Sequence, residues 1–228
     1  MDLDLKTRIR TSIILFILIY FCIFINLYVS LSSLIIISIL SWFEFIKMTN
    51  KIFSVKKEFF ANLLLILSAF YFVIFAGISY YIIAIDKIYF FYIILICIFS
   101  DIGGYVFGKT FKGKKLTKIS PNKTISGSLG SFIFALIPCL LFKIIFLYTE
   151  IYSLSFVNFF LINLIMSIFL SLVCQLGDLF ISYFKRLADV KYTGTILPGH
   201  GGILDRIDGI IFAIPIFGIL GYLINFLG

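Results

Sequence analysis

Long apolar runs recur along almost the whole chain, and they constrain its fold more than any other feature. Hydrophobic residues make up 62% of the 228 residues and charged residues only 13%, whereas a soluble domain carries roughly 25% charged residues. Several runs reach the roughly 20 residues that a helix needs to cross about 30 Å of hydrocarbon. Phe, Ile and Leu repeat without sustained alternation, which disfavours a transmembrane barrel. We therefore predict an all-α, polytopic helical membrane protein.

The order of apolar and polar stretches predicts seven transmembrane helices, with eight as the alternative. The expected spans cover, in order, approximately residues 11–28, 34–46, 59–85, 87–108, 128–147, 155–174 and 207–227. A short turn at residues 29–32 is expected between the first two spans. The sixth helix is expected to continue beyond the hydrocarbon to Leu187, because no Gly–Pro break interrupts it. The alternative count arises because residues 59–85 form either one long tilted span or two short spans near Gly77.

The distribution of positive charge favours one span over residues 59–85 and a cytoplasmic N-terminus. Lys and Arg are enriched in the cytoplasmic loops of membrane proteins. With one span there, only Lys87 and Lys143 of the 19 Lys and Arg residues lie on the outer side. Two spans would instead place the basic run 109–123 outside. The net charge of +8 is thus explained by topology, and because no nucleic-acid-binding motif accompanies it, no nucleic-acid partner is expected.

The chain is expected to be a single integral-membrane domain over residues 1–228, because neither an internal repeat nor a long linker divides it. N-terminal spans occupy residues 1–98, and the polar motifs lie in residues 99–228. Basic residues precede the first apolar run, but no small-residue cleavage site follows, so we expect a retained first helix. The four cysteines lie in apolar segments without CxxC spacing, which indicates neither zinc nor a disulfide framework. Glu44 has two interpretations: a carboxylate at the headgroup level beside Lys47, or a functional group.

Two polar segments are expected together on the cytoplasmic side, and the first covers residues 100–124. Asp101 lies in an otherwise apolar stretch, and an intramembrane carboxylate is by default a functional hypothesis, although pairing with a lysine would also explain it. Lysines are frequent from residue 109 to residue 123, and setting the topology is enough to explain most of them. The turn at residues 120–124, SPNKT, is more informative because it offers hydroxyls, an amide and a lysine to phosphate oxygens. Its candidate contacts are Ser120, Lys123 and Thr124.

The second polar segment, residues 175–208, lies just before the last apolar run. If residues 175–187 are helical, a carboxylate, a hydroxyl and a cation fall on one face, namely Asp178, Ser182 and Lys185. Such a row can hold a hydrated cation beside a phosphate. Arg186 and Lys191 add charge that can neutralise phosphate oxygens, although an anchor at the membrane surface explains the Lys185–Arg186 pair equally well.

Residues 198–202, PGHGG, predict a tight turn whose glycines leave backbone N–H groups free to approach an anion. His200 is the only histidine of the chain. It is a candidate for phosphate contact or proton transfer, and it can equally bond the backbone of its own loop. Without a thiolate or a second imidazole nearby, a zinc site is not indicated.

Two carboxylates follow the turn, at the start of the last apolar run. Asp205 and Asp208 are three residues apart and so share a face. Carboxylates at a helix start cap backbone N–H groups, and that role is compatible with metal binding. Asp178 adds a third carboxylate from another helix end. Acids gathered in an apolar setting repel unless a cation lies between them, so the sequence favours a Mg²⁺ site at these oxygen ligands.

Taken together, these motifs resemble the signature of the phosphatidate cytidylyltransferases, also called CDP-diacylglycerol synthases. That signature is a serine, Lys-Arg, a lysine, Pro-x-His-Gly-Gly and Asp-Arg-x-Asp, and it corresponds here to Ser182, Lys185-Arg186, Lys191, Pro198–Gly202 and Asp205-Arg206-Ile207-Asp208. The segments around Ser100-Asp101, Ser120–Thr124 and Gln175–Leu179 are also similar to the family. The resemblance covers about the C-terminal 130 residues. In two departures, Tyr192 stands where the family usually has Asp and Ser126 where it usually has Glu.

The resemblance implies that CTP and phosphatidic acid react to give CDP-diacylglycerol and diphosphate in phospholipid biosynthesis. It implies Mg²⁺ as cofactor, with a second, monovalent cation left open, and an active site at the cytoplasmic face of a bacterial inner membrane. A homodimer is likewise left open. The implied metal ligands are Asp178, Asp205 and Asp208, which act in catalysis together with Lys185, Arg186, Lys191 and His200. The implied substrate-binding residues are Asp101, Ser120, Lys123, Thr124, Ser182, Gly201, Gly202 and Arg206.

Two other functions remain open at this point. A CTP-dependent lipid or polyprenol kinase has to activate a hydroxyl, and this sequence offers only His200 or a spare carboxylate as a base. A small ion-coupled transporter would use Asp101 and Asp178 as intramembrane sites, but transporter sites lie near the bilayer midplane, whereas these carboxylates are expected at one face.

Overall fold

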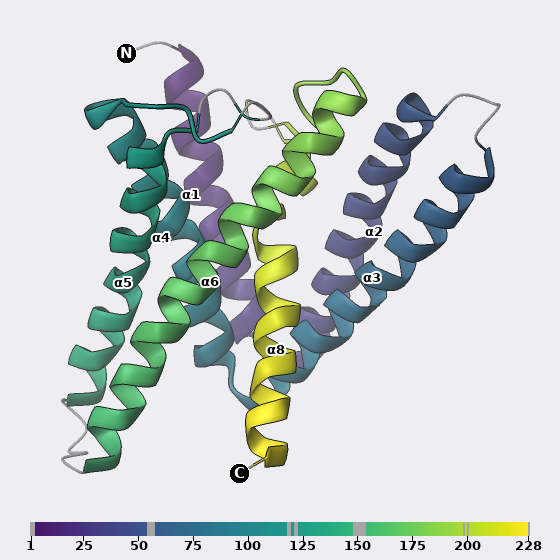
Figure 1. Ribbon diagram of the computed structural model, residues 1–228. Helices are drawn as coiled ribbons and strands as arrows, with labels where there is room; N and C mark the ends of the chain where they lie inside the picture. Colours follow the sequence, from purple (N-terminus) through teal and green to yellow (C-terminus); the bar gives the residue numbers. More distant parts are fainter. Residues whose placement is uncertain are drawn as a thin grey trace.

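The structure is a computed structural model that describes residues 3–53, 58–117, 120, 123–147, 154–197, 199 and 201–227. Within these residues the chain is helical, apart from loops and two isolated β-bridges. The helices are α1 (Leu3–Phe24), α2 (Leu27–Ile52), α3 (Glu58–Ile85), α4 (Lys87–Phe111), α5 (Ile125–Leu147), α6 (Leu154–Leu187), α7 (Leu204–Ile207) and α8 (Ile210–Leu227). Alternating long helices run in opposite directions, as expected for a chain that crosses a membrane repeatedly (Figure 1).

Helix α6 crosses the bundle and contacts α4, α5 and α8, while α5 packs along α4 and α2 along α3 (Figure 1). The buried core lies where these helices meet and includes Ile93 and Ile96 of α4, Leu170 of α6 and Ile214 of α8. Most of the remaining apolar side chains point outward: Phe70 of α3, for example, is 69% exposed. An apolar exterior around an apolar core is what a bilayer permits, since lipid tails are as apolar as the protein interior.

Five of the described helices are long and apolar enough to cross a membrane: Leu27–Ile52, Glu58–Ile85, Lys87–Phe111, Ile125–Phe142 and Phe160–Leu187. Arg10–Phe24 and Ile210–Tyr222 are shorter apolar helices. The prediction of an all-α, polytopic membrane protein is therefore confirmed. The predicted total of seven spans is reached only when the two shorter apolar helices are counted.

The expected helices exist, but several of their boundaries differ from the prediction. Residues 58–85 form one unbroken helix, which confirms the interpretation as a single element. The turn predicted at residues 29–32 is wrong, because the break falls at Ile25 and Asn26, where the Asn26 side chain caps α2 by accepting a hydrogen bond from the Val29 N–H at 2.8 Å. The second helix also runs beyond residue 46 to Ile52, because its polar final turns still pack inward through buried side chains.

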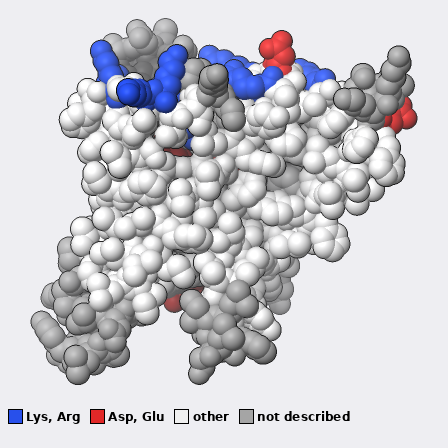
Figure 2. Space-filling model, viewed as in Figure 1, with Lys and Arg blue, Asp and Glu red and all other residues white. Residues whose placement is uncertain are grey.

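Positive charge gathers at one end of the molecule. In the view of Figure 2, the Lys and Arg side chains of the described residues gather along the end at which α2, α4 and α6 finish. This arrangement agrees with the expectation that the basic loops share one side of the membrane.

Helices α4 and α5 pack unusually closely because small residues line their contact. A Cβ added at Gly130 of α5 would lie 2.6 Å from the carbonyl oxygen of Gly103 in α4, and a Cβ at Gly127 would lie 2.8 Å from the carbonyl oxygen of Gly104. Such distances leave no room for a methyl group. The two backbones therefore touch directly, as in other membrane helix pairs with small residues at the interface.

We predict that Gly130→Ala destabilises the protein by about 1–3 kcal/mol, because the added methyl overpacks this contact. Gly77→Ala is the matched control: Gly77 is also in a helix interior, and a Cβ there meets nothing within 4 Å. Thermal unfolding in detergent measures the difference, with a midpoint lowered by roughly 2–4 °C for each kcal/mol in a chain of this size. Equal midpoints for the two variants would contradict the close-packed contact.

Candidate active site

A cavity of about 310 Å³ opens at the basic end of the molecule, between α4, α5, α6 and the loop that joins α4 to α5. Of the predicted site residues, Asp101, Ser120, Lys123, Thr124 and Asp178 line it. The first polar segment and part of the second therefore meet at one place, as the sequence predicted.

The loop between α4 and α5 folds back on itself and holds Lys123 over the cavity. The Leu116 N–H donates to the Lys123 carbonyl at 2.8 Å, and the Thr124 hydroxyl accepts from the Gly127 N–H at 3.0 Å, which caps the start of α5. The Lys123 ammonium lies 2.5 Å from a carboxylate oxygen of Asp178. This ion pair joins the two polar segments, with both side chains still one-quarter exposed.

Helix α6 presents the predicted polar face. Because α6 continues to Leu187, Asp178 and Ser182 are one turn apart, and the Ser182 hydroxyl donates to Asp178 at 3.2 Å. Beside Asp178, Gly177 meets the segment between α7 and α8 so closely that a Cβ there would lie 2.8 Å from the carbonyl oxygen of Asp208. Glycine thus allows the helices to approach at the point where each carries a carboxylate.

Asp208 lies next to Asp178 and is only 9% exposed. Burial raises the pKa of Asp208 well above its ordinary range, and the nearby Asp178 and Asp101 carboxylates raise this pKa further, while Lys185 opposes them. The Asp178 and Asp208 carboxylates interact electrostatically. Two acids that interact in this way share a proton or hold a cation between them.

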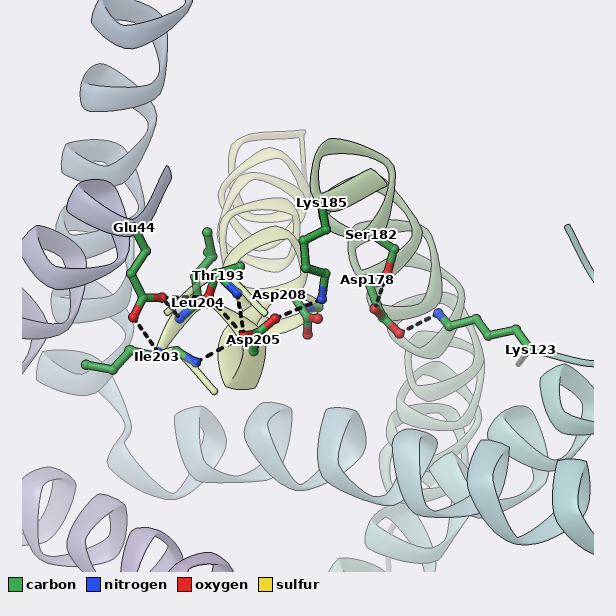
Figure 3. Close-up of polar contacts among 12 residues, drawn as sticks. Glu44, Lys123, Asp178, Ser182, Lys185, Thr193, Ile203, Leu204, Asp205 and Asp208 are labelled. Carbon is green, nitrogen blue, oxygen red and sulfur yellow. Dashed lines mark hydrogen bonds and ion pairs between the residues drawn. The ribbon is translucent and has the colours of Figure 1, made fainter. Parts of the chain in front are cut away.

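Asp205 is held in a different way, entirely by groups of the protein (Figure 3). The Lys185 ammonium lies 2.8 Å from one carboxylate oxygen. The other oxygen accepts from the N–H groups of Thr193 at 2.8 Å and Gly202 at 3.0 Å, and the Thr193 hydroxyl is 3.0 Å away. Asp205 therefore ties the loop after α6 to α6 itself.

The three carboxylates predicted to bind metal thus separate into a pair and an anchor. Asp178 and Asp208 interact electrostatically, whereas Asp205 is engaged by the loop (Figure 3). Among the residues that the structure describes, no group of three or more His, Cys, Asp or Glu side chains is gathered closely enough to hold a metal ion. The assignment of Asp205 to metal stays a prediction.

The glycine turn closes on itself. Leu197 and Gly201 exchange two backbone hydrogen bonds, and the Gly202 N–H donates to Asp205. Gly199 and Gly201 have φ of 75° and 85°, values that favour glycine. The amides of Gly201 and Gly202 are thus used inside the protein, and their contact with substrate stays a prediction. Pro198 and His200 lie outside the described residues, so the prediction for the histidine is untested.

The remaining predicted cations are not part of the cavity lining. Arg186, Lys191 and Arg206 are exposed, and the Lys191 ammonium lies 5.3 Å from the ring centroid of Tyr192. Arg206 and Lys123 both interact electrostatically with Asp101. This end of the molecule therefore combines the acids Asp178 and Asp208 with several positive charges.

Sequence reasoning missed the importance of Glu44. This side chain, in α2, is only 2% exposed, so its interpretation as a headgroup-level carboxylate is wrong. It accepts hydrogen bonds from the Thr193 hydroxyl at 2.7 Å and from the N–H groups of Ile203 and Leu204 at 3.0 and 2.9 Å (Figure 3). The only signal in the sequence was an acid within an apolar stretch, before the end of its helix.

Comparison with known proteins identifies relatives. The chain is similar to the phosphatidate cytidylyltransferase of Staphylococcus haemolyticus, with 44% identity over 136 residues, and to that of Bacillus subtilis, with 41% identity over 128 residues. These alignments cover 58% and 56% of this chain, and 48% and 45% of the relatives. The enzyme of the same name from Rickettsia typhi is 48% identical over 113 residues, which is 48% of either chain. The chain thus spans about half the length of the curated relatives that it matches.

A family model gives the broader result. The model described as the cytidylyltransferase family matches residues 51–224, which is most of the chain and includes every polar motif discussed above except Glu44. The chain therefore belongs to the cytidylyltransferase family.

Proposed function

We propose that this protein is a phosphatidate cytidylyltransferase, which converts CTP and phosphatidic acid into CDP-diacylglycerol and diphosphate. The observation that carries the proposal is the cavity where Lys123 pairs with Asp178, beside Asp208, at the basic end of a membrane-spanning bundle. The names of the relatives support the same activity. A lipid substrate reaches such a site along the apolar helices, and a nucleotide reaches it from water.

The reaction has to bring two polyanions together. The lipid phosphate is already nucleophilic, so no strong general base is needed. One of its oxygens attacks the α-phosphorus of CTP, a new P–O bond forms, and the bond from that phosphorus to the bridging oxygen breaks as diphosphate leaves. Catalysis then consists of positioning and of stabilising negative charge.

The cations of the site fit this task. Lys123 lines the cavity, and Arg206 lies close enough to interact with the same carboxylate, Asp101. Arg186 and Lys191 are exposed nearby and are proposed to neutralise the leaving diphosphate. Lys185 is paired with Asp205, and we propose that it reaches a substrate phosphate from that position. Ser120 and Thr124 of the same cavity, together with Ser182, are proposed as hydroxyl contacts to substrate oxygens.

The acid pair fits a divalent cation. Mg²⁺ is usually held by one or two carboxylates together with substrate phosphates, and Asp178 and Asp208 supply two carboxylates that interact electrostatically. We propose them as the holders of Mg²⁺, with Asp205 as a further ligand if its loop contacts open. When bound there, the metal polarises phosphoryl oxygens and offsets their charge. Asp101 adds negative charge at the cavity wall.

The positive end of the molecule is proposed to face the cytoplasm of a bacterial cell. Among the described residues this end carries a band of Lys and Arg side chains (Figure 2), as the positive-inside rule expects, and the named relatives are bacterial. CTP is available on that side. The two departures from the family pattern also lie here: Tyr192 is exposed, and Ser126 donates a hydrogen bond to the Lys112 carbonyl, so its hydroxyl stabilises the loop below the cavity.

The activity is tested by incubating the purified full chain in lipid nanodiscs with CTP labelled in the cytidine, phosphatidic acid and Mg²⁺. We expect a labelled lipid and one diphosphate for each lipid formed. A kinase would instead move the terminal phosphate to an alcohol and leave CDP in solution. That outcome, or the absence of any labelled lipid, would refute the proposal.

We predict that Asp178→Asn and Asp208→Asn each lower kcat by about 100-fold or more, because several kcal/mol of charge stabilisation amount to a tenfold rate change for each 1.4 kcal/mol. Asp86→Asn is the matched control: this aspartate caps α4 at the opposite end of the molecule, and its loss is expected to leave the rate nearly unchanged. Steady-state kinetics at several Mg²⁺ concentrations provide the measurement. Near-normal rates for both site variants at low Mg²⁺ would rule out the acid pair as the metal site.

A further inference from the structure

Glu44 is buried in α2, far in sequence from the motifs of the site, yet every hydrogen bond that it accepts comes from the segment before α8. Its two carboxylate oxygens accept from the Thr193 hydroxyl and from the N–H groups of Ile203 and Leu204. All three donors are electrically neutral. A buried carboxylate is tolerated when several donors converge on it, so the segment is arranged around this charge.

The fit between Glu44 and the segment leaves no spare room. A Cβ at Gly194 would lie 2.5 Å from one Glu44 carboxylate oxygen, and a Cβ at Gly202 would overlap the other. Glycine at both positions therefore lets the backbone reach the carboxylate. Residues 194 and 202 lie on either side of the glycine turn, so Glu44 clamps both of its ends.

Thr193 connects this clamp to the ion pair of the site. Its hydroxyl lies 2.7 Å from Glu44 and 3.0 Å from Asp205, and the single hydroxyl hydrogen can be given to only one of these carboxylates at a time. Asp205 in turn holds Lys185. A continuous row of contacts thus runs from α2, through Thr193 and Asp205, to the cation on α6 (Figure 3).

The clamp also fixes where the acid pair forms. Leu204, the first residue of α7, is held by Glu44 through its N–H and is fully buried. Asp208 follows one helical turn later, at the end of α7, and there it interacts electrostatically with Asp178. A shift of residues 203 and 204 would therefore move Asp208 relative to Asp178.

We propose that Glu44 is a positioning residue of the active site: it holds residues 193–204 so that Lys185 and Asp208 keep their places around the reacting phosphates. The proposal rests on the proposed cytidylyltransferase function for its kinetic part only. It gives the N-terminal spans a direct role in the site. The family resemblance had placed the site residues in the C-terminal part of the chain, residues 99–228.

The test compares Glu44→Gln with wild type in the full chain in nanodiscs. The amide keeps the size of the side chain but removes the charge and one acceptor, so residues 203 and 204 lose part of their hold. We expect kcat to fall by about 10- to 100-fold, as when groups that orient a site are changed, with KM for CTP changed less than twofold. Hydrogen exchange is the second readout, and amides of residues 193–204 are expected to exchange faster while those of residues 125–142 do not change.

Thr193 provides a coupled variant and a rescue. Thr193→Val removes the hydroxyl at nearly constant shape and is expected to lower kcat, whereas Thr193→Ser restores it. Because the two residues act in one row of contacts, the double variant Glu44→Gln/Thr193→Val is expected to fall much less than the product of the single effects. Ser41→Ala is the matched control for a change in buried α2, since Ser41 is fully buried there and its hydroxyl has no hydrogen-bond partner.

The outcomes separate the two proposals. Loss of folded protein in Glu44→Gln with unchanged kcat and unchanged exchange in what remains would show a purely structural role and overturn the inference. A fall in kcat of the double variant equal to the product of the two single falls would overturn the inference as well. If wild type forms no cytidine-bearing lipid, the proposed function fails, and the exchange of residues 193–204 still decides whether Glu44 holds this segment.

Discussion

A carboxylate buried among apolar helices needs hydrogen-bond donors or a cation beside it, and this constraint sorts the acids of the site into two kinds. Glu44 and Asp205 are supplied by donors from the loop before α8 and, for Asp205, by Lys185. Asp178 and Asp208 instead interact with one another, with Lys123 paired to Asp178 and Lys185 acting on Asp208. The first kind shapes the loop. The second is left with negative charge that an added cation can compensate, which is why the proposed chemistry is assigned there.

Much of the fold could be predicted because a helix that crosses lipid requires a long apolar run, which is easily seen in the sequence. Each apolar run became a helix, and the distribution of lysines chose one helix for residues 59–85, as found in α3. The break between α1 and α2 was predicted at the wrong place for a local reason. The connection has only two residues, and hydropathy does not change there, although Asn26 is a residue type that commonly caps a helix. The end of α2 was predicted too early because hydropathy does not detect helical turns that are polar in sequence but buried in the structure.

The site could be predicted wherever its residues are close in sequence. The helical face that joins Asp178 to Ser182 follows from spacing alone. The contact between Glu44 and Thr193 does not, because 149 positions separate them and no periodicity relates a residue on a helix to one in a distant loop. The same limit applies to Asp205, whose position three residues before Asp208 suggested a shared ligand set. The loop instead turned its carboxylate toward Lys185 and Thr193.

The glycine contact between α4 and α5 has a consequence for how the cavity can change shape. Because the two backbones touch at Gly103 and Gly130, neither helix can slide or rotate against the other without a collision, so together they form one rigid wall. Asp101 and the start of α5 belong to that wall. Any widening of the cavity therefore falls to its opposite side, where α6 and the loop bearing Lys123 are joined across the cavity by an ion pair. An anion that enters the cavity would compete with Asp178 for the Lys123 ammonium and would so weaken this contact between the two elements.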